Sequence, residues 1–487
     1  MRFKLIFSIV GFMGILCGIA MMIPAFTDMF YGHYDAGQRF LISGALCVAI
    51  GLLIRLICGV REEPLRIKEM FLTTTLIWVF CALFCAIPFF VSVYKISLTD
   101  AVFEAMSGLT TTGATVLTGL DNMTPGILLW RSILQWVGGA GIVIVVITIL
   151  PALRIGGMQF FTTESSAGSE RDLPTVIQNM RAILVYFIGL TVLCAILLKW
   201  AGMTGFDSLN HAMTTISTGG FSTHDTSIGY FKNPTIEWIV MLFMFISGMP
   251  LILGLHLFKR RWRSIKEDSQ ILFYVKFIFL SVLLLTFLRW LSYRFAPVEL
   301  MVYIREGLFA IVSVVTTTGF VSENYQIWGN FALAFFMFLL VVGGCTGSTT
   351  GGIKMFRFSV LSRASAVRLK TVVQPYGVFI PRYGSHTITD DVLISVLVFF
   401  GLYLGTAVII SLGLSAYGLD FVSALSASLT ALSNVGPALG HLIGPDKTFD
   451  VLPDAVKWIL TLAMLIGRLE FVSVFVLFFP FLWRRNV

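Results

Sequence analysis

Four short polar segments, each with a glycine at the same place, are the residues of this sequence whose types and spacing could do chemistry. Their letters are TTTGA at residues 110–114, STGGF at 217–221, TTTGF at 316–320 and SNVGP at 433–437. Glycine lets a chain turn a carbonyl oxygen toward a shared centre, and threonine hydroxyls can add further oxygen ligands. The segments contain no carboxylate, which argues against a divalent-cation site built from acidic side chains. These residue types therefore predict that oxygen atoms bind a hard monovalent cation.

The glycines of these segments recur at a spacing of roughly a hundred residues. Aligned on Gly113, Gly220, Gly319 and Gly436, the segments lie 107, 99 and 117 residues apart. A long apolar run and a short semi-polar stretch precede each segment, and a second apolar run follows it. One such segment alone would be an ordinary turn between helices. Four copies at repeat spacing predict an internal repeat of helix, re-entrant half-helix and helix.

An acidic residue before each glycine predicts where the half-helix begins. Asp100, Asp207 and Glu306 each lie thirteen residues before the aligned glycine, whereas Asp420 lies sixteen before it. A carboxylate at a helix N-terminus caps free N–H groups and suits the positive end of the helix dipole. The negative end of each half-helix would then point at the segment that follows it.

The composition indicates a chain that is dissolved in lipid. Of its 487 residues 57% are hydrophobic and 12% charged, with a mean hydropathy of +0.89, which excludes a water-soluble domain. Most of the long apolar runs can cross ~30 Å of hydrocarbon as helices. We therefore expect an all-α integral membrane protein with about ten transmembrane helices, two before the repeats and two in each repeat. The clearest runs are residues 5–26, 40–57, 71–93, 127–150, 183–198 and 392–412.

The repeats and the basic residues together predict the organisation and topology. If the spans alternate, 22 of the 34 Lys and Arg residues lie on the side of the N-terminus, nine on the opposite side and three inside spans. Cytoplasmic loops are the richer in Lys and Arg, so we expect both termini in the cytoplasm. The expected units are residues 1–68 (two extra helices), 69–175 (repeat 1), 176–268 (repeat 2), 269–385 (repeat 3 with an intramembrane loop and a basic cytoplasmic segment) and 386–487 (repeat 4).

Non-helical backbone at membrane depth predicts a pathway for a cation. Such backbone is tolerable only when it is buried in protein or lines a wet cavity. Four segments around one pseudo-fourfold axis would form rings of carbonyl oxygens that replace the water shell of a dehydrated ion, as in a potassium filter. The fourth segment is poor in threonine, so its oxygens must come mainly from the backbone of Asn434, Val435 and Gly436.

Glycines in the second apolar run of each repeat predict close packing between helices. The third of these runs differs, because ten residues at 343–352 read GGCTGSTTGG, and each glycine costs a helix ~1 kcal/mol. We expect a loop inside the membrane there, although a flexible kink or an early end of the span is the other interpretation. The clustered glycines of the four runs are Gly138, Gly139 and Gly141, then Gly248, then Gly343 and Gly344, then Gly467.

Arg468 is a charged residue deep in the last apolar run. A guanidinium facing lipid there would cost at least ~2.5 kcal/mol, so the side chain should face the interior. It could hydrogen-bond carbonyl groups of the loop at 343–352 and oppose cations, or simply tie two helices together. Glu470 lies two positions further on, toward a different part of the helix, and is not its expected partner.

These motifs resemble the Trk/Ktr/HKT superfamily of potassium transporters, and most closely its bacterial Trk-type membrane subunit. The resemblance covers essentially the whole chain; its most specific marks are the four segments, residues 343–354 (GGCTGSTTGGIK) and residues 467–470 (GRLE). It implies uptake of K+ across the bacterial inner membrane, with K+ as the transported ion and no bound cofactor. A glycine in the first filter goes with K+ preference in the family, which favours K+ over Na+ here because of Gly113.

The resemblance also implies roles for particular residues and partners. It implies a gate at the loop, a homodimer and a cytosolic nucleotide-binding regulatory subunit. For the basic segment between Lys354 and Arg382, contact with anionic lipid is the other interpretation. The expected K+ ligands are Thr111, Thr112, Gly113, Thr218, Gly219, Gly220, Thr317, Thr318, Gly319, Asn434, Val435 and Gly436. The expected gate residues are Gly343, Gly344, Thr346, Gly347, Ser348, Thr349, Thr350, Gly351, Gly352 and Arg468.

Other classes of function fit the sequence less well. A K+/H+ or K+/Na+ symporter on the same scaffold stays open as the alternative, although a proton relay would need a chain of carboxylates inside the spans. An enzyme is not expected, because the six histidines do not cluster and no H-E-x-x-H or G-x-S-x-G motif occurs. Nucleic-acid binding is not expected despite the net charge of +8, because the aromatic residues do not interleave with a basic stripe.

Overall fold

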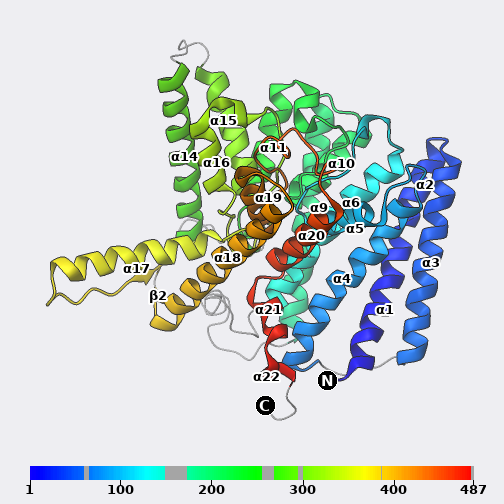
Figure 1. Ribbon diagram of the computed structural model, residues 1–487, viewed down its shortest axis with the longest axis horizontal. Coiled ribbons are helices and arrows are strands. Elements are labelled where there is room, and N and C mark those ends of the chain that lie inside the picture. Colours follow the sequence, from blue (N-terminus) through cyan, green and yellow to red (C-terminus); the bar gives the residue numbers. More distant parts are fainter. Residues whose placement is uncertain (60–64, 149–172, 255–267, 294–299, 385, 484–487) are drawn as a thin grey trace.

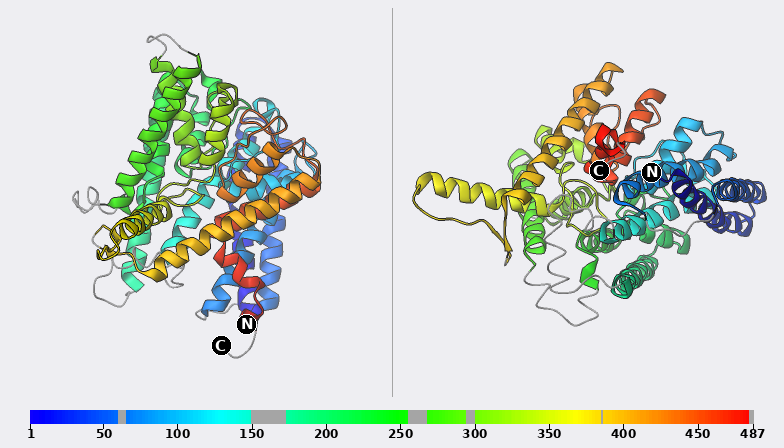
Figure 2. Two further views of the ribbon diagram at one scale, coloured as in Figure 1. Left: turned by 60° about the vertical axis from the view of Figure 1, so that its left-hand side comes forward. Right: turned by 90° about the horizontal axis from the view of Figure 1, so that it is seen from below.

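The computed structural model is a helical bundle. It describes residues 1–59, 65–148, 173–254, 268–293, 300–384 and 386–483. In those ranges the two strands, β1 (Arg382–Tyr383) and β2 (His386–Thr387), form one short antiparallel hairpin. Figures 1 and 2 show that the last described helix, α22 (Pro480–Trp483), lies at the same end of the bundle as the start of the chain. The described part of the chain thus begins and ends on one side.

Two helical stretches before the repeats pack against each other through glycines. They are α1 (Phe3–Ala20), continued by α2 (Met22–Phe30), and α3 (Tyr34–Cys58). A Cβ atom on Gly18 would lie 2.6 Å from the carbonyl oxygen of Gly44, and one on Gly44 would lie 2.8 Å from that of Gly18. Small residues therefore let the two backbones touch, which is how helices associate where lipid removes the hydrophobic drive.

After these helices the chain follows the same order of elements four times: a long helix, a short helix, a glycine segment and a second helix. The first two sets are α4 (Ile67–Val91), α5 (Leu98–Leu109) and α6 (Pro125–Thr148), then α9 (Leu173–Trp200), α10 (Gly205–Ile216) and α11 (Pro234–Ser247). The other two are α14 (Ser269–Tyr293), α15 (Leu300–Val315) and α16 (Asn330–Leu339), then α18 (Asp390–Ala416), α19 (Phe421–Ser433) and α20 (Asp454–Arg468). Short 3-10 turns, η1 (Leu120–Asn122), η2 (Ser227–Phe231) and η4 (Tyr325–Trp328), precede the second helices of the first three sets.

Six helical stretches in the described ranges are long and apolar enough to cross a membrane. They are Phe3–Phe30, Tyr34–Cys58, Lys68–Val91, Met180–Trp200, Ser269–Ser292 and Asp390–Ala416. These are the two N-terminal stretches and the long helix of each of the four sets. The prediction of a mostly helical chain rich in apolar helices is confirmed. The count of about ten crossings stays a prediction.

The starts of the short helices match three of the four acidic residues. Ser97 and Thr204 cap α5 and α10 by accepting the N–H of Asp100 and Asp207, and Asp420 caps α19 by accepting that of Ser423. The expectation for Glu306 is wrong. Helix α15 begins six residues earlier, at Leu300, and the buried Glu306 carboxylate instead pairs with Arg289, 3.1 Å away.

The expectation that only the third repeat has a broken second helix is also wrong. Helix α16 does end before the loop at 343–352, but α11 ends at Ser247, before Pro250, and α20 ends at Arg468. Proline lacks the N–H that a continuing helix needs, and Glu470 has a left-handed φ of 55°. Three of the four second helices therefore stop inside the bundle.

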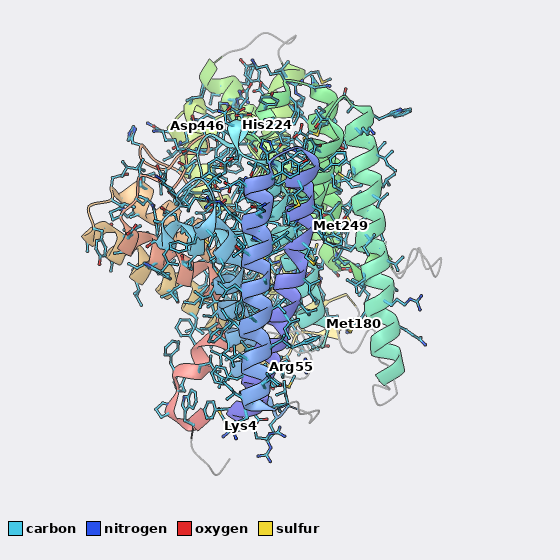
Figure 3. The ribbon with its side chains drawn as sticks, turned by 90° about the vertical axis from the view of Figure 1, so that its right-hand side faces the viewer. Lys4, Arg55, Met180, His224, Met249 and Asp446 are labelled. Atoms are coloured by element: carbon cyan, nitrogen blue, oxygen red, sulfur yellow. The ribbon has the colours of Figure 1, made fainter. Side chains whose placement is uncertain are left out.

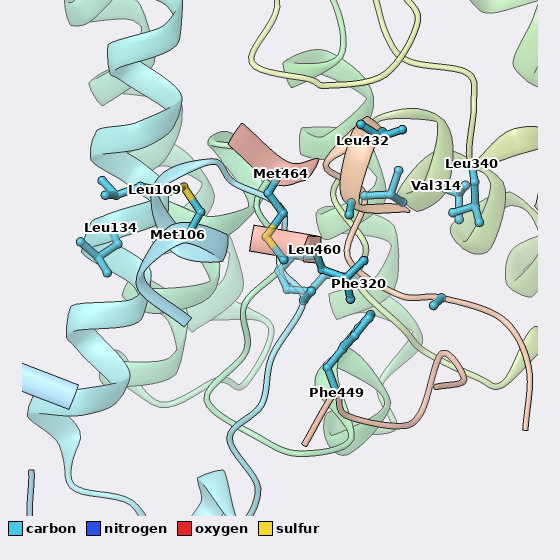
Figure 4. Packing of buried hydrophobic residues seen from close by; sticks show 14 of the residues in the cluster. Met106, Leu109, Leu134, Val314, Phe320, Leu340, Leu432, Phe449, Leu460 and Met464 are labelled. Carbon is cyan, nitrogen blue, oxygen red and sulfur yellow. The ribbon is translucent and has the colours of Figure 1, made fainter. Parts of the chain in front are cut away.

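The short helices form the buried centre, and the long helices surround them. Every residue of α5 from Ala101 to Leu109 is buried. Figure 4 shows Met106 and Leu109 of α5 beside Leu134 of α6, and Leu460 and Met464 of α20 nearby. The outward faces of the long helices carry exposed apolar side chains, as lipid contact requires. The polar glycine segments thus lie inside an apolar shell.

The packing prediction for the clustered glycines is confirmed where the glycines face a neighbour. A Cβ atom on Gly138 would collide with the carbonyl oxygen of Leu109, and one on Gly139 would lie 2.7 Å from the Ser217 side chain. Helix α6 can therefore touch the ends of both α5 and α10. Gly141 differs, since a Cβ atom there would meet none of the described residues within 4 Å, and packing against them does not explain it.

A helical arm leaves the bundle between the third and fourth sets. Helix α17 (Met355–Val373) projects to the left in Figure 1 and returns through the β1–β2 hairpin to α18. Its base is packed, with Phe356 and Val360 buried. Its far end exposes large apolar side chains, namely Leu369, Val372, Val373, Tyr376 and Val378. After α20 the chain ends in the short pieces α21 (Val472–Phe475), η5 (Val476–Phe478) and α22.

Candidate functional site

The four glycine segments share one unusual backbone conformation. In each, two residues have a positive φ, with one ordinary residue between them. A threonine in the left-handed region is rare because its branched Cβ crowds the backbone, and such strain costs about 1–3 kcal/mol and concentrates at functional sites. The left-handed pairs are Thr111 (52°) and Gly113 (82°), Thr218 (53°) and Gly220 (79°), Thr317 (53°) and Gly319 (78°), and Asn434 (54°) and Gly436 (106°).

The four segments touch one another in a closed ring. In each, the aligned glycine lies against the carbonyl oxygen of the residue that precedes the aligned glycine of another segment. A Cβ atom on Gly436 would lie 2.6 Å from the Thr112 oxygen, and Cβ atoms on the other three glycines would collide with their oxygens outright. The contacts run from Gly113 to Gly219, Gly220 to Thr318, Gly319 to Val435 and Gly436 to Thr112. The ring therefore closes from the fourth segment back to the first, and no side chain fits at the glycines.

Buried side chains hold this ring from behind. The Gln135 side chain of α6 makes two hydrogen bonds to the second segment. Its amide N–H donates to the Gly219 oxygen at 2.7 Å, and its amide oxygen accepts from the Phe221 N–H at 3.0 Å. The Asn434 amide donates to the Thr112 hydroxyl at 2.9 Å and to the Met464 oxygen at 3.0 Å, which links the fourth segment to the first and to α20. These hydrogen bonds hold the segments in place. They matter because backbone carbonyl groups buried away from water have no other hydrogen-bond partner.

On one side the ring opens into a concave mouth. Its lining includes all four aligned glycines together with the charged residues Arg131, Asp225, Asp446 and Lys447, and His224. Figure 3 shows His224 and Asp446 at the end of the molecule opposite Lys4 and Arg55. The ring is therefore reached from the face that lies away from the N-terminus.

His224 joins the loops of two sets at this mouth. Its Nδ1 lies 2.5 Å from the Asp121 carboxylate and its Nε2 lies 3.6 Å from that of Asp207, while its ring stacks on Tyr230. Burial alone would lower the pKa of His224, but the two carboxylates outweigh it and raise the pKa above its usual value. The two carboxylates thus favour the protonated, positively charged form of His224 at the mouth.

On the other side the loop at 343–352 lies against the ring. Thr218 donates to the Thr349 hydroxyl at 3.0 Å, and the Gly351 N–H donates to the Thr317 hydroxyl at 2.7 Å. A Cβ atom on Gly351 would collide with the carbonyl oxygen of Ser433. The loop therefore touches three of the four segments. The contacted residues precede the aligned glycines in the chain, so they lie closer to the ends of the short helices, whereas the glycines line the mouth.

The loop is closed at its base and buried throughout. Val342 and Ile353 form an isolated parallel bridge, with the Gly343 N–H donating to the Ile353 oxygen at 2.9 Å. The Cys345 N–H donates to the Gly248 oxygen at 2.9 Å, so the break after α11 receives the loop. Thr346, Ser348, Thr349 and Thr350 are all buried. The expected loop is thus a compact, buried stretch of hydrogen-bonded backbone, and its depth in the membrane stays a prediction.

Two buried cations contact this loop. Arg468 donates from Nη1 to the Thr349 oxygen at 2.9 Å, which is the expected bond to a loop carbonyl. Its Nε and Nη2 are buried and have no hydrogen-bond partner among the described residues. Lys354 donates from Nζ to the backbone and hydroxyl oxygens of Thr350. Glu470 pairs with Arg357 at 2.6 Å and not with Arg468, as its position along the chain suggested.

Comparison with known proteins gives the family. The chain matches the profile of the family described as TrkH, cation transport protein, over residues 36–485. The chain belongs to the TrkH family. This TrkH-family chain is 38% identical to the Trk system potassium uptake protein TrkI of Halomonas elongata, over 99% of this chain and 98% of that protein. It is 35% identical to the Trk system potassium uptake protein TrkH of Escherichia coli K12, over the full length of both.

A solved structure of the family has the same fold. The crystal structure of the potassium transporter TrkH from Vibrio parahaemolyticus superposes with a TM-score of 0.91 at 33% identity, covering 99% of this chain and 100% of that one. The helical arrangement described above is therefore that of a TrkH-type transport protein.

Several residues of this TrkH-family site were not predicted from the sequence. Gln135 and Arg131 stand four residues apart in the apolar run of α6, and polar residues at helical spacing inside a span are a usable signal. Glu104 gives a weaker signal, because α5 also carries other polar residues. The contact of Asn434 with Thr112 joins residues 322 apart in sequence, and no local pattern could indicate it.

Proposed function

We propose that this protein takes up K+ across the bacterial inner membrane through a selective pore whose filter is the ring of glycine segments. The observation that carries the proposal is the closed ring of carbonyl oxygens and glycines, on which no side chain can intrude. Backbone carbonyl rings replace the water shell of K+ in selective filters. The names of the relatives, potassium uptake proteins and a potassium transporter, support K+ as the cargo.

The proposed ligands are backbone oxygens in all four segments. Threonine hydroxyls contribute less than the sequence suggested, because several are engaged elsewhere. The hydroxyls of Thr110 and Thr112 pair at 2.7 Å, and those of Thr316 and Thr318 pair at 2.8 Å. Thr218 and Thr317 hydrogen-bond to the loop. The different composition of the fourth segment is therefore compatible with a filter made of backbone.

We propose that the loop at 343–352 and Arg468 form the gate. The loop lies across one side of the ring, and a buried guanidinium with a single hydrogen bond opposes a cation approaching from that side. Lys354 adds a second cation on the same loop. Movement of the loop away from Thr218, Thr317 and the end of α19 would open the pathway.

We propose a topology of ten crossings in four pseudo-symmetric repeats plus two N-terminal helices, divided at the boundaries expected from the sequence. Both termini would face the cytoplasm, because Lys4 and Arg55 lie at the end opposite the mouth. Part of the charge bias falls on residues 60–64, 149–172 and 255–267, which lie outside the described residues. The mouth would then face outward and the arm α17 would lie on the cytoplasmic side.

The partners proposed are lipid, a second copy of the chain and a cytosolic nucleotide-binding subunit. The arm formed by α17 and the β1–β2 hairpin leaves the bundle with exposed apolar side chains at its far end. A regulatory subunit acting there could pull on the loop, because α17 begins at Met355, directly after Lys354. The mass of the purified complex in detergent, with and without nucleotide-binding subunit, tests both partners.

Ion flux into liposomes tests the proposed function. Purified protein should pass K+ and Rb+ faster than Na+ and Li+, and with equal pH on both sides the current should reverse at the K+ equilibrium potential. A reversal potential that shifts with an imposed pH or Na+ gradient would favour the K+/H+ or K+/Na+ symporter. Equal flux of all four ions through folded protein would contradict the filter.

A further inference from the structure

The stretch of chain that leaves each glycine segment is tethered back to its short helix by a polar side chain. In the third segment the Ser313 hydroxyl donates to the Phe320 oxygen at 2.7 Å. In the fourth, the Ser426 hydroxyl donates to the Leu439 oxygen at 2.6 Å and accepts from its N–H at 2.9 Å. In the second, His211 lies 2.9 Å from the Ser222 hydroxyl. Each tether fixes the chain on the mouth side of the ring.

The first segment is the one in which the tether is a carboxylate paired with a cation. Glu104 of α5 accepts hydrogen bonds from the Thr115 hydroxyl at 3.0 Å and from the Val116 N–H at 3.1 Å. Arg131 of α6 donates from Nε to the same carboxylate at 2.7 Å. Glu104 is 0% exposed and Arg131 is 1% exposed.

Arg131 also reaches across to the second segment. Its Nη1 donates to the Ser222 oxygen at 2.7 Å, its Nη2 donates to the Thr115 hydroxyl at 3.2 Å, and its guanidinium stacks on the Phe221 ring, 4.1 Å from the centroid. One planar side chain thus holds the mouth-side ends of two segments at a fixed separation. A lysine carries the same charge but lacks the fork that makes these contacts together.

We propose that Glu104 and Arg131 are positioning residues that set the distance between the first two glycine segments and so determine cation selectivity. The inference rests on the proposed K+ filter and adds the residues that hold its geometry. Neither side chain belongs to the ring, because their contacts are to Thr115, Val116, Phe221 and Ser222, beyond the aligned glycines in the chain. In the snug-fit account of selectivity, a ring distinguishes K+ from a smaller cation because its oxygens are kept from closing inward.

A rival explanation is that the pair acts by charge alone, since Arg131 lines the mouth. Arg131→Lys separates the two, because it keeps the positive charge and removes the fork. Glu104→Gln keeps the shape of the side chain and removes the negative charge. The double variant Glu104→Gln/Arg131→Gln removes both charges, so it folds without an unpaired buried ion but still lacks the brace.

The experiment measures Na+ and K+ flux into liposomes for each variant, normalised to protein that elutes as a single folded species in detergent. We expect the ratio of Na+ to K+ flux to rise on the order of tenfold in Arg131→Lys and in the double variant, the scale of losing one charge-assisted hydrogen bond. The matched control is Arg289→Lys, since Arg289 is also buried and paired with a glutamate, but its described contacts are with Glu306, Tyr303 and Trp328. Its flux ratio should stay at the wild-type value.

Three results would overturn the inference, and they are distinguishable. A selective wild type together with Arg131→Lys and double variants that keep the wild-type ratio would overturn the positioning role alone. A change in Glu104→Gln with none in Arg131→Lys would assign the effect to charge. A folded wild type that passes Na+ as fast as K+ would overturn the proposed function itself.

Discussion

At the scale of single residues, the ring is built from backbone strain that the surrounding bonds maintain. Three threonines and one asparagine hold a left-handed φ two residues before the aligned glycine of each segment. Each such residue costs about 1–3 kcal/mol unless its neighbours over-determine it. Hydrogen bonds hold three of these four strained residues in place. The hydroxyls of Thr218 and Thr317 bond to the loop, and the side-chain amide of Asn434 makes two hydrogen bonds.

Gly113→Ser should lower selectivity for K+. The new side chain would both strain a φ of 82° and collide with the Gly219 oxygen, which pushes the first two segments apart. We expect the ratio of Na+ to K+ flux to rise about tenfold, equivalent to about 1.4 kcal/mol. The control is Gly119→Ser, where φ is 73° but a Cβ atom meets nothing within 4 Å. A Gly113→Ser protein with wild-type selectivity would contradict the ring as the filter.

Arg468→Ala should raise K+ flux. The substitution removes a buried guanidinium that holds the loop through one bond to Thr349, so both the electrostatic barrier and the anchor of the loop disappear. We expect flux in liposomes to rise by tenfold or more, since a buried charge opposes a nearby cation by a few kcal/mol at an effective dielectric of about 20, and each 1.4 kcal/mol is a factor of about ten. Lys457→Met is the control, because Lys457 is also buried in α20 but pairs with Asp100. Unchanged flux in folded Arg468→Ala protein would show that Arg468 links helices structurally and does not oppose cations.

At the scale of elements, the second helices stop where the ring needs room. The ends of α11 and α16 and the loop form one hydrogen-bonded unit: Cys345 donates to Gly248, and the Leu251 N–H donates to the Gly347 oxygen at 2.9 Å. Continuous helices would fill this space with side chains and leave no backbone beneath the segments. The ends of α11 and α16 therefore leave room beneath the ring for a loop that can move.

Deleting residues 347–351 should open the pathway. The deletion removes the Thr349 and Gly351 contacts with the ring and with Arg468, whereas the Val342–Ile353 bridge at the base stays outside the deleted stretch. We expect a higher K+ flux because the loop no longer covers the ring, and a lower selectivity because Thr218 and Thr317 lose the hydrogen bonds that support their left-handed φ. Deleting the equally long stretch 375–379 from the exposed end of the arm is the control. Lower flux from folded protein would show that the loop supports the ring and does not obstruct it.

At the scale of the whole molecule, an apolar shell of long helices encloses polar backbone. Lys4 and Arg55 mark one end and the mouth at His224 and Asp446 marks the other (Figure 3). The ring lies between them, with the loop on the side away from the mouth. In the proposed pathway an entering cation would cross the mouth, the ring and the loop in that order.

An epitope tag inserted at Gly202 should be accessible from outside intact spheroplasts. Gly202 is exposed in the turn between α9 and α10, and a Cβ atom there meets nothing within 4 Å, so the insertion should be tolerated. Tags at the N-terminus and after Val487 should bind antibody only after the membrane is permeabilised. The reverse pattern would contradict the topology argued from the basic residues.

The sequence by itself determined the class of fold and the location of the candidate site. Hydrophobic runs of helical length indicate helices that contact lipid, and four glycines at repeat spacing indicate non-helical backbone. Both signals can be read from the sequence because each depends on the residue types within one short stretch of chain. The sequence also predicts that Arg468 lies beside the loop, as observed. A charged side chain inside a span has few possible hydrogen-bond partners other than a backbone oxygen.

Only the tertiary structure decided how the four segments meet. The left-handed threonines, the contacts of Gly113 with Gly219 and of Asn434 with Thr112, and the brace from Arg131 to Ser222 all depend on packing between distant parts of the chain. Glu306 shows the same limit, because its carboxylate could cap a helix or pair with Arg289, and the partner brought near by α14 decided it. Local pattern fixes which groups need partners. The fold decides which partners they find.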